Sequence, residues 1–412
     1  MQGKDTTNST FFQLFKPAFG NNFFKTLTRL KADKYLKKLS TLQFIELISQ
    51  AQLEQQRSLR DISNSFNHEE FQEAIQNESF SASQISRRLK DLPTEVLITL
   101  FKELINNLGK DFGFHKLSQG LKQIYLIDST TISLCFSQYP WADYRKTRAG
   151  IKLHLRLKFH DDEVLPDDVV ITSARPSDKT QMDNLVVEDE NALNVFDRAY
   201  VDYDKFDYYC EKGIDFVTRL KKNAVSQVME TLPVKGNVIN HQVVYLGTQY
   251  KKMKHPLRLI EVKDTEGNTV IIATNNFTLD VEEISDIYRN RWQIELFFKW
   301  LKQNMQVKHF YGLSQKAVEN QLYIALINYC LLLSLKLKTA FSGPLLQMKR
   351  ILKACLYQPF AYFMRILHRK PSRTSKGRRK THHELIFAET ERQVIAGEAD
   401  HLNDLTYDPL VL

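Results

Sequence analysis

Apolar residues recur at helical spacing through the first quarter of the chain. Between residue 10 and about residue 115 they fall three or four positions apart, as Leu42, Ile45 and Ile48 do. This period places apolar side chains on one face of a helix. The pattern therefore predicts a helical N-terminal domain.

A serine-capped segment within this region carries two adjacent arginines. Ser81 can accept a hydrogen bond from the first turn of a short helix, and Arg87 and Arg88 follow in that helix. We expect both arginines to be exposed and to contact DNA. A capped surface helix with solvated charges is the alternative.

The pattern changes to strands after residue 120. Residues 123–134, 150–160 and 166–175 are β-rich runs with short connections, which favours an antiparallel meander. Residues 177–186 then fit a helix and residues 192–200 a further strand. This order allows the last strand to lie parallel beside the first, through a helical crossover.

A second strand-rich region is followed by helices. Residues from about 215 to 277 are predicted to form a β-rich insertion, with a turn at 266–268. A helix should begin near Asp280, with Glu283 closing a capping box, and continue to about residue 304. Further helices are expected through residue 335 and over 345–367.

These elements predict an α/β protein with three parts. Residues 1–118 would form a helical N-terminal domain and residues 119–340 an α/β domain containing the insertion. Residues 341–412 would hold C-terminal helices, a basic segment and an acidic tail. A chain of 412 residues is long enough for several such units.

The charge balance is consistent with a polyanionic partner. The chain has 57 Lys and Arg against 48 acidic residues, a net charge of +9. Many basic proteins simply carry solvated lysines, so charge alone leaves both interpretations open. The basic residues between 369 and 380 have the same two interpretations, a DNA contact or a solvated linker.

The cysteines and apolar segments indicate a cytoplasmic protein. The four cysteines are far apart and form no CxxC pair, which disfavours a zinc ribbon or a disulfide framework. The N-terminus lacks the pattern of a signal peptide. Residues 322–335 are apolar but few and include Asn328, so we expect a buried helix and no membrane association.

Asp128 lies inside an otherwise apolar strand. Burying an ionised carboxylate without a partner is costly, so Asp128 should have a partner. That partner can be a metal ion, a cationic side chain or a hydrogen bond at the strand end.

Asp197 ends a second apolar strand. Binding sites in α/β sheets lie at the carboxyl ends of strands, so parallel strands would bring Asp128 and Asp197 together. Two close carboxylates repel each other unless a divalent cation lies between them. Alternatively, Asp197 pairs with Arg198 or Lys205.

A polar stripe runs along the helix expected after Asp280. It falls on one face of an otherwise apolar helix and consists of Tyr288, Arg291, Glu295, Lys299 and Lys302. Ordinary solvated surface, with Arg291 and Glu295 as an i,i+4 pair, is the other interpretation.

The spacing Tyr-x2-Arg-x3-Glu-x6-Lys resembles the signature of the IS-four family of bacterial insertion-sequence transposases. Tyr288, Arg291, Glu295 and Lys302 match its four positions. The resemblance extends over roughly residues 10–370. The segment at 58–62 is also similar to an N-terminal domain that often accompanies this catalytic domain.

The resemblance implies a ribonuclease-H-like fold with an insertion before its last acid. It implies catalysis by Asp128, Asp197 and Glu295, which would hold two Mg²⁺ or Mn²⁺ ions. Tyr288, Arg291 and Lys302 match residues that contact DNA phosphates near the cut, and we add Lys299 from the same stripe.

The implied activity is cut-and-paste transposition. The partners would be double-stranded DNA, as terminal inverted repeats and target, and a second copy of the chain in a synaptic dimer. In a bacterial cytoplasm the protein would associate with the nucleoid. A related endonuclease without strand transfer and a catalytically silent DNA-binding protein are the alternatives.

Two features lie outside this pattern. Members that cut through a hairpin use a tryptophan in the insertion to hold a flipped base, and here the insertion contains none. Tyr245 and Tyr250 are the candidates for that place, because any aromatic face can stack on a base. Lys152 and His154 either face the catalytic site or form the polar side of their strand.

Overall fold

A computed structural model of the chain describes residues 8–111, 122–160, 163–263, 267–369 and 392. It divides into two compact units. The helical unit comprises residues 1–115, 137–141 and 300–377, and the sheet unit comprises residues 116–136, 142–299 and 378–412.

The helical unit is built from ten α-helices within the described residues. They are α1 (Thr10–Phe15), α2 (Asn21–Arg29), α3 (Thr41–Glu54), α4 (Leu59–Asn64), α5 (Glu69–Ile75), α6 (Ala82–Asp91), α7 (Thr94–Asp111), α12 (Gln315–Lys338), α13 (Leu345–Ala354) and α14 (Phe360–Leu367). The helical N-terminal region predicted from the apolar spacing is confirmed. The expected helical region over 345–367 consists of two helices, since α13 ends at Ala354 and α14 begins at Phe360, after its N-cap residue Pro359.

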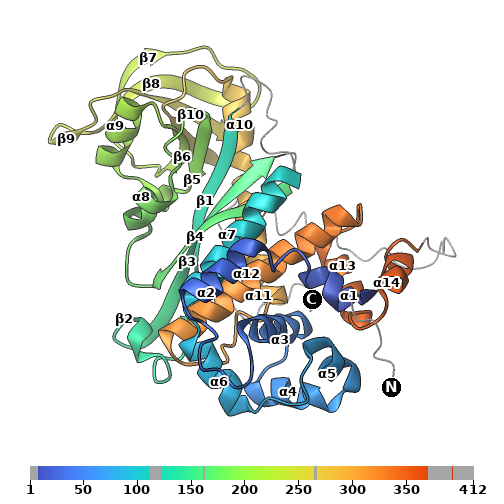
Figure 1. Cartoon of the computed structure of the whole chain (residues 1–412). Coiled ribbons are helices and arrows are strands. Elements are labelled where there is room, and N and C mark those ends of the chain that lie inside the picture. The colour runs from blue at the N-terminus through green and yellow to red at the C-terminus, as the bar shows by residue number, and fades with distance from the viewer. Residues whose placement is uncertain (1–7, 112–121, 161–162, 264–266, 370–391, 393–412) are drawn as a thin grey trace. The chain divides into compact units, whose positions relative to one another are not determined.

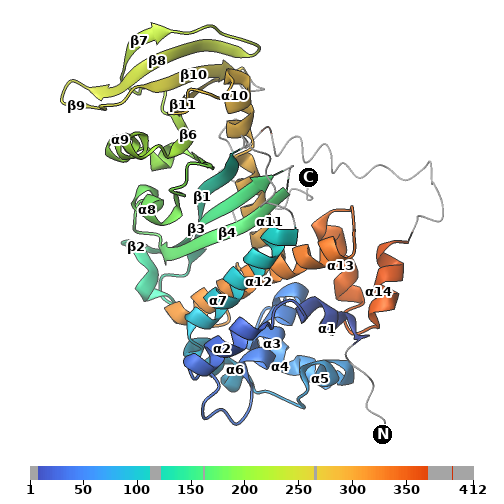
Figure 2. The ribbon, with the colours of Figure 1, turned by 45° about the horizontal axis from the view of Figure 1, so that its top comes forward.

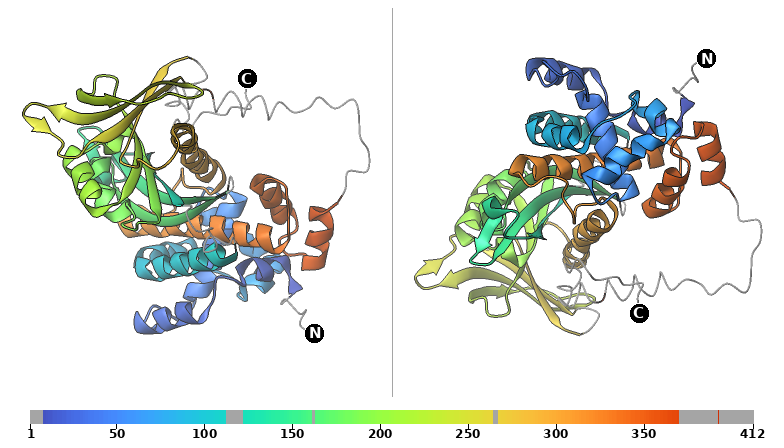
Figure 3. Two further views of the ribbon diagram at one scale, coloured as in Figure 1. Left: turned by 90° about the horizontal axis from the view of Figure 1, so that it is seen from above. Right: turned by 90° about the horizontal axis from the view of Figure 1, so that it is seen from below.

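Helix α12 lies among the other helices of this unit. It packs against α3, α6 and α7, and Figure 3 shows α7 beside it in both views. By length and composition α12 is one candidate membrane span, but 89% of its most apolar window is buried within the protein. The buried amide of Asn328 donates to Gln52 Oε1 at 2.9 Å. The prediction of a buried helix here is confirmed.

Arg88 corrects one of our expectations. Ser81 caps α6 as predicted, but the Arg88 side chain is only 6% exposed. Its guanidinium pairs with Asp33 at 2.6 Å and donates to the backbone oxygen of Ala32 at 3.0 Å. A buried arginine needs such partners, and these bonds hold α6 to the segment before α3. Arg88 is therefore structural, whereas Arg87 is exposed.

The sheet unit contains one large mixed sheet (Figure 1). Its strands are β1 (Gln123–Leu134), β2 (Asp143–Arg145), β3 (Arg148–His160), β4 (Glu163–Ser173), β5 (Ala192–Phe196), β6 (Asp215–Leu220), β7 (Ser226–Thr231), β8 (Val238–Thr248), β9 (Lys251–Lys252), β10 (Leu257–Lys263) and β11 (Thr269–Thr274). Its helices are α8 (Met182–Leu185), α9 (Tyr203–Lys212), α10 (Val281–Arg289) and the first part of α11 (Trp292–Asn304).

Strand β3 lies at the centre of the predicted meander, and β1 lies between β3 and β5. Neighbouring strands follow the order β2-β3-β1-β5-β6-β11-β10-β8-β7, and β4 pairs with β3 (Figure 2). Strands β1, β3 and β4 are antiparallel, while β5 lies parallel to β1, as expected. The first strand of the predicted insertion, β6, pairs in parallel with β5, so the insertion strands continue the same sheet.

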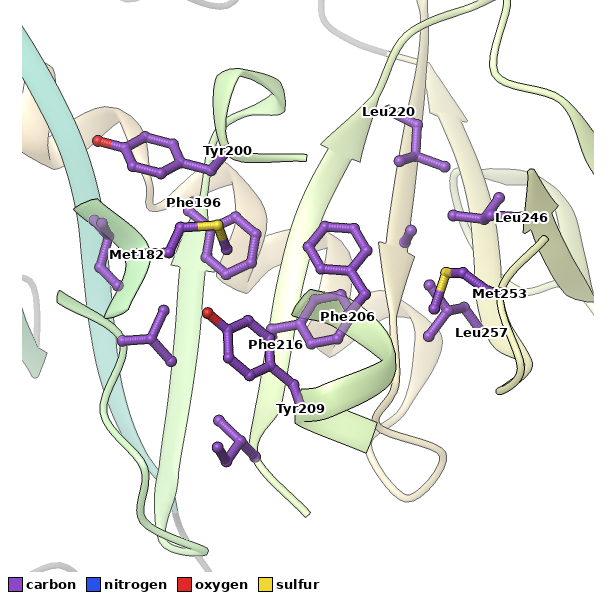
Figure 4. Close-up of a cluster of buried hydrophobic side chains, with 14 of the residues drawn as sticks. Met182, Phe196, Tyr200, Phe206, Tyr209, Phe216, Leu220, Leu246, Met253 and Leu257 are labelled. Carbon is purple, nitrogen blue, oxygen red and sulfur yellow. The ribbon is translucent and has the colours of Figure 1, made fainter. Parts of the chain in front are cut away.

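Aromatic packing supports the parallel strands. Phe206 on α9 stacks on Phe216 of β6 with ring centroids 4.5 Å apart, and Phe196 of β5 lies 5.8 Å from Phe216. Figure 4 shows these rings together with Tyr209 and Met182. Because such rings bury large apolar areas, they hold α9 against the sheet and position the end of β5.

The helix expected from Asp280 to residue 304 is interrupted. Asp280 caps α10, but it accepts from the backbone N–H of Glu282, and α10 ends at Arg289. The backbone N–H of Arg291 then bonds to the carbonyl of Tyr288, three residues back, before α11 begins at Trp292. This tighter turn interrupts the predicted helix, although Arg291 still contacts both Tyr288 and Glu295 of the predicted stripe.

Substituting the two neighbouring arginines of α6 should separate their roles. Arg88→Gln is expected to lower the free energy of unfolding by about 2–3 kcal/mol, because it leaves Asp33 without its charged partner. Arg87→Gln should change it by less than about 0.5 kcal/mol, as for most exposed sites. Urea unfolding of both variants measures this difference, and equal losses would contradict a structural role for Arg88.

Candidate active site

Asp128 and Asp197 stand at neighbouring positions of two parallel strands. The last paired residues of β1 and β5 are Ile127 and Phe196, which lie opposite each other. Asp128 and Asp197 are the next residues of the two strands. Because parallel neighbours are separated by about 4.8 Å, this register brings both carboxylates to one edge of the β1–β5 pair.

The Asp128 carboxylate is surrounded by charge and is largely buried. Its side chain is 17% exposed, and Oδ1 accepts the backbone N–H of Ser129 at 2.7 Å. Burial raises the pKa of Asp128, the Arg291 guanidinium opposes that rise, and the charges of Asp197 and Glu295 add to it. Asp197 and Glu295 are therefore both close enough to act on the Asp128 carboxylate.

Arg291 joins two of these acids. Its Nη1 donates to Asp128 Oδ2 at 2.9 Å and its Nη2 to Glu295 Oε1 at 2.6 Å. The i,i+4 pair that was expected for an ordinary solvated helix surface is thus present. The same guanidinium, however, also bonds to Asp128 on β1. Asp128 therefore has a cationic side chain as its partner in this structure.

The proposed partner Lys205 is not available to Asp197. Lys205 forms an ion pair with Asp183 instead. Arg198, the other candidate, is exposed, whereas Asp197 is half-buried. The alternative that a pair with Lys205 neutralises Asp197 is therefore wrong.

A hydrogen-bonded network supports the backbone beside Asp128. Asp178, which the sequence analysis did not single out, accepts Ser129 Oγ at 2.7 Å and Lys152 Nζ at 3.0 Å. His154 Nδ1 lies 3.6 Å from the same Asp178 oxygen, and its Nε2 is 3.0 Å from Thr172 Oγ1. Lys152 and His154 thus contact the support of the site. No spacing in the sequence links Asp178 to Ser129, which lies 49 positions earlier. Asp178 stands at the start of a 3-10 helix, Asp178–Gln181.

Tyr288 and Trp292 line a cavity of about 470 Å³ in the sheet unit. Arg219, Lys263 and Arg291 also contribute to its wall. Burial raises the pKa of Tyr288 to about 12. Trp292 lies outside the insertion, and the sequence analysis did not consider it as a base-stacking residue. Residues of the insertion strands β8, β10 and β11 nonetheless line the same cavity.

The two lysines of the predicted stripe fall on either side of a unit boundary. Lys299 is half-buried and is the last residue of its segment of the sheet unit, whereas Lys302 belongs to the helical unit. Burial, together with the charge of Lys308, lowers the pKa of Lys302 to about 8. Contact of either lysine with DNA stays a prediction. Of the basic run after residue 368, residues 370–380 lie outside the described residues.

The acids are close but do not form a ready-made metal cage. Within the described residues, no group of three or more His, Cys, Asp or Glu side chains is arranged to hold a metal ion. The donor chemistry nonetheless fits, because carboxylate oxygens are the ligands that Mg²⁺ prefers. Arg291 bonds to both Asp128 and Glu295, so two carboxylates that could hold a metal ion are joined by a guanidinium in this structure.

Sequence comparisons place this chain in a known family. The family described as transposase DDE domain matches residues 119–331. A domain of unknown function matches residues 6–71. Because the first match spans half of the chain, the chain belongs to the family of transposases with a DDE domain. It is a DNA transposase, an enzyme that cleaves DNA and transfers the cut strand.

Several curated relatives carry transposase names. The chain is 30% identical over 259 residues to a transposase for insertion sequence element IS5377 from Geobacillus stearothermophilus, covering 61% of this chain and 67% of the relative. It is 29% identical over 282 residues to transposase y4zB from Sinorhizobium fredii, covering 66% and 77%. A transposase for element IS4SA from Synechocystis is 25% identical over 356 residues, covering 84% and 96%.

Among solved structures, a synaptic complex of piggyBac transposase with hairpin DNA aligns with a TM-score of 0.46 and 10% identity. The alignment covers 94% of this chain and 85% of that chain. The family assignment rests on the sequence comparisons.

The buried His154 should make the protein less stable in acid. Burial lowers the pKa of His154 to about 4, below its ordinary value of 6.5. Between these values the unfolded chain binds a proton that the folded protein does not, so stability falls as pH falls from about 6.5 to about 4. His154→Gln should flatten this part of the profile of melting temperature against pH. The exposed His68→Gln serves as the control, and identical slopes in wild type and His154→Gln would contradict the assignment.

Proposed function

We propose that Asp128, Asp197 and Glu295 are the catalytic acids of a cut-and-paste transposase. The observation that carries this proposal is the convergence of all three on one edge of the sheet, with Arg291 bonded to two of them. A ribonuclease-H-like fold, with the mixed sheet as its core, accommodates that arrangement. The substrates are the terminal inverted repeats of the element and a target duplex.

The acids would hold two Mg²⁺ or Mn²⁺ ions. When bound, such ions activate a water molecule and stabilise the departing oxygen of a phosphodiester. Asp128, Asp197 and Glu295 would be the protein ligands of these ions, through their carboxylate oxygens. Burial of Asp128 favours this use, because a desolvated carboxylate gains most from a nearby cation.

The chain's other residues would orient the DNA. Arg291 has a planar pair of donors suited to a phosphate, and the half-buried Lys299 adds positive charge on α11. Lys302 is only 5% exposed, so it would act on the DNA through its charge and not by direct contact. The liberated 3′-hydroxyl replaces water as nucleophile at the target, so one site serves cleavage and strand transfer. Residues 1–118, with Arg87 exposed on α6, would bind the element's ends, and two chains would bring two ends together.

The cavity beside α10 is suited to a nucleotide next to the cut. Its aromatic residues Tyr288 and Trp292 offer faces for stacking, and its basic residues Arg219 and Lys263 offer charge for a phosphate. Tyr250 is 99% exposed, and the ring of Tyr245 is covered by Lys252 Nζ at 4.5 Å. Trp292 is therefore a better placed base-stacking residue than either tyrosine.

Removing the central acid should abolish catalysis. Asp128→Ala is expected to reduce Mg²⁺-dependent nicking of element ends by roughly a thousandfold or more, since residues of one catalytic unit fail together. Glu190→Gln, at an exposed acid of the same unit, should leave the rate within about twofold of wild type. Nicking of end-labelled duplexes measures both rates. Full nicking activity of Asp128→Ala would contradict the assignment of the catalytic triad. If the wild-type protein nicks DNA but does not join pre-cut ends to a target, the alternative of an endonuclease without strand transfer would be favoured.

The cavity can be tested with a fluorescent base. With 2-aminopurine next to the cleavage site, binding should change its fluorescence as the base leaves the duplex and stacks on Trp292. Trp292→Ala should remove the stacking signal and slow cleavage by about tenfold, within the range expected for loss of one base-stacking contact. Tyr250→Ala is the comparison. A loss confined to Tyr250→Ala would transfer the stacking role to the tip of the insertion.

A further inference from the structure

One guanidinium serves two of the three catalytic acids at once. Arg291 lies in the turn between α10 and α11 and its side chain is 13% exposed. Its two terminal nitrogens bond separately to Asp128 and Glu295, at 2.9 and 2.6 Å. Such charge-assisted bonds are strong, and each uses a carboxylate oxygen that a metal ion would also need.

Two lysines of the sheet unit, Lys152 and Lys205, already have acidic partners. Lys152 is bonded to Asp178 at 3.0 Å, and Lys205 is paired with Asp183. Arg291 alone among the ion pairs described here reaches both Asp128 and Glu295. Removing it would leave two partly buried carboxylates facing each other and Asp197, which is unfavourable without a replacement cation.

We propose that Arg291 is the counter-ion of the metal-free site, and that divalent ions displace it from Asp128 and Glu295 so that it becomes free to bind a DNA phosphate. This inference rests on the proposed function, because it requires the acids to be the metal ligands. It goes further by making metal binding and DNA binding depend on one side chain.

The exchange has a thermodynamic consequence. A guanidinium that holds the acids cannot also bind phosphate, so metal binding releases a DNA-binding group. Coupling between two ligands is reciprocal, so DNA should raise metal affinity by the same factor by which metal raises DNA affinity. Metal and DNA would then load the site together.

Binding of Mn²⁺ to the full-length protein without DNA tests the first half of this exchange. Free Mn²⁺ is counted by electron paramagnetic resonance. Arg291→Gln should bind Mn²⁺ roughly tenfold more tightly than wild type, because a competing cation with two charge-assisted bonds is gone. Arg291→Lys keeps the charge but cannot bridge both acids through separate nitrogens, so its affinity should lie between the two. Arg289→Gln, at an arginine paired only with Asp286 among the described ion pairs, should match wild type.

Arg291→Gln should also melt at a lower temperature than Arg289→Gln in EDTA and recover most of the difference in Mn²⁺. If Arg291→Gln does not fold, Arg291→Lys provides the comparison. The second half is tested with a short fluorescein-labelled duplex. Replacing EDTA by Ca²⁺ should strengthen its binding to wild type and to Arg145→Gln, at an exposed arginine of the sheet unit, but not to Arg291→Gln.

The outcomes separate this inference from the proposed function. If Asp128→Asn loses the Mn²⁺ site of wild type but Arg291→Gln binds Mn²⁺ no more tightly than wild type, the counter-ion role is overturned and the catalytic acids stand. If wild type and Asp128→Asn bind Mn²⁺ equally, the acids are not the metal ligands and both proposals fail.

Discussion

The parallel pairing of β1 with β5 is the constraint on which the site depends. It ends with Ile127 opposite Phe196, so the residues that follow bring two carboxylates to one edge of the sheet. A shift of one residue would turn one of them to the other face, because side chains alternate along a strand. The aromatic packing of Phe206 and Phe216 beneath β5 holds that register.

Crowding of acids creates the need for a cation, and the break between α10 and α11 supplies one. Because the backbone forms a tighter turn between Tyr288 and Trp292, the Arg291 side chain extends from a turn and not from the middle of a helix. From this position it bonds to Asp128 of β1 and to Glu295 of α11. Arg291 links β1 to α11 and would also compete with metal ions for the same carboxylates. The contacts that hold these two elements together would therefore also control metal binding.

The N-terminal helices show how a sequence pattern can mislead. Arg87 and Arg88 look equivalent in a capped helix, but adjacent residues point to different sides of a helix. The Arg87 side chain is exposed, whereas that of Arg88 is buried. Arg88 is satisfied by Asp33 and Ala32, residues more than fifty positions away. No local spacing reports such partners, so the distinction between a DNA contact and a structural ion pair required the packed helices.

The antiparallel meander, the parallel crossover to β5 and the helical N-terminal region could all be predicted from the sequence, because apolar periodicity is a local property of the backbone. Asp128 and Asp197 stood out as acids in apolar strands, whereas Glu295 was identified through a spacing that resembles a family signature. Only the tertiary structure decided that Arg291 bridges two of the acids, that Asp178 supports Ser129 and that Trp292 lines a cavity. These contacts join segments far apart in the chain, and their partners are chosen by how strands and helices pack.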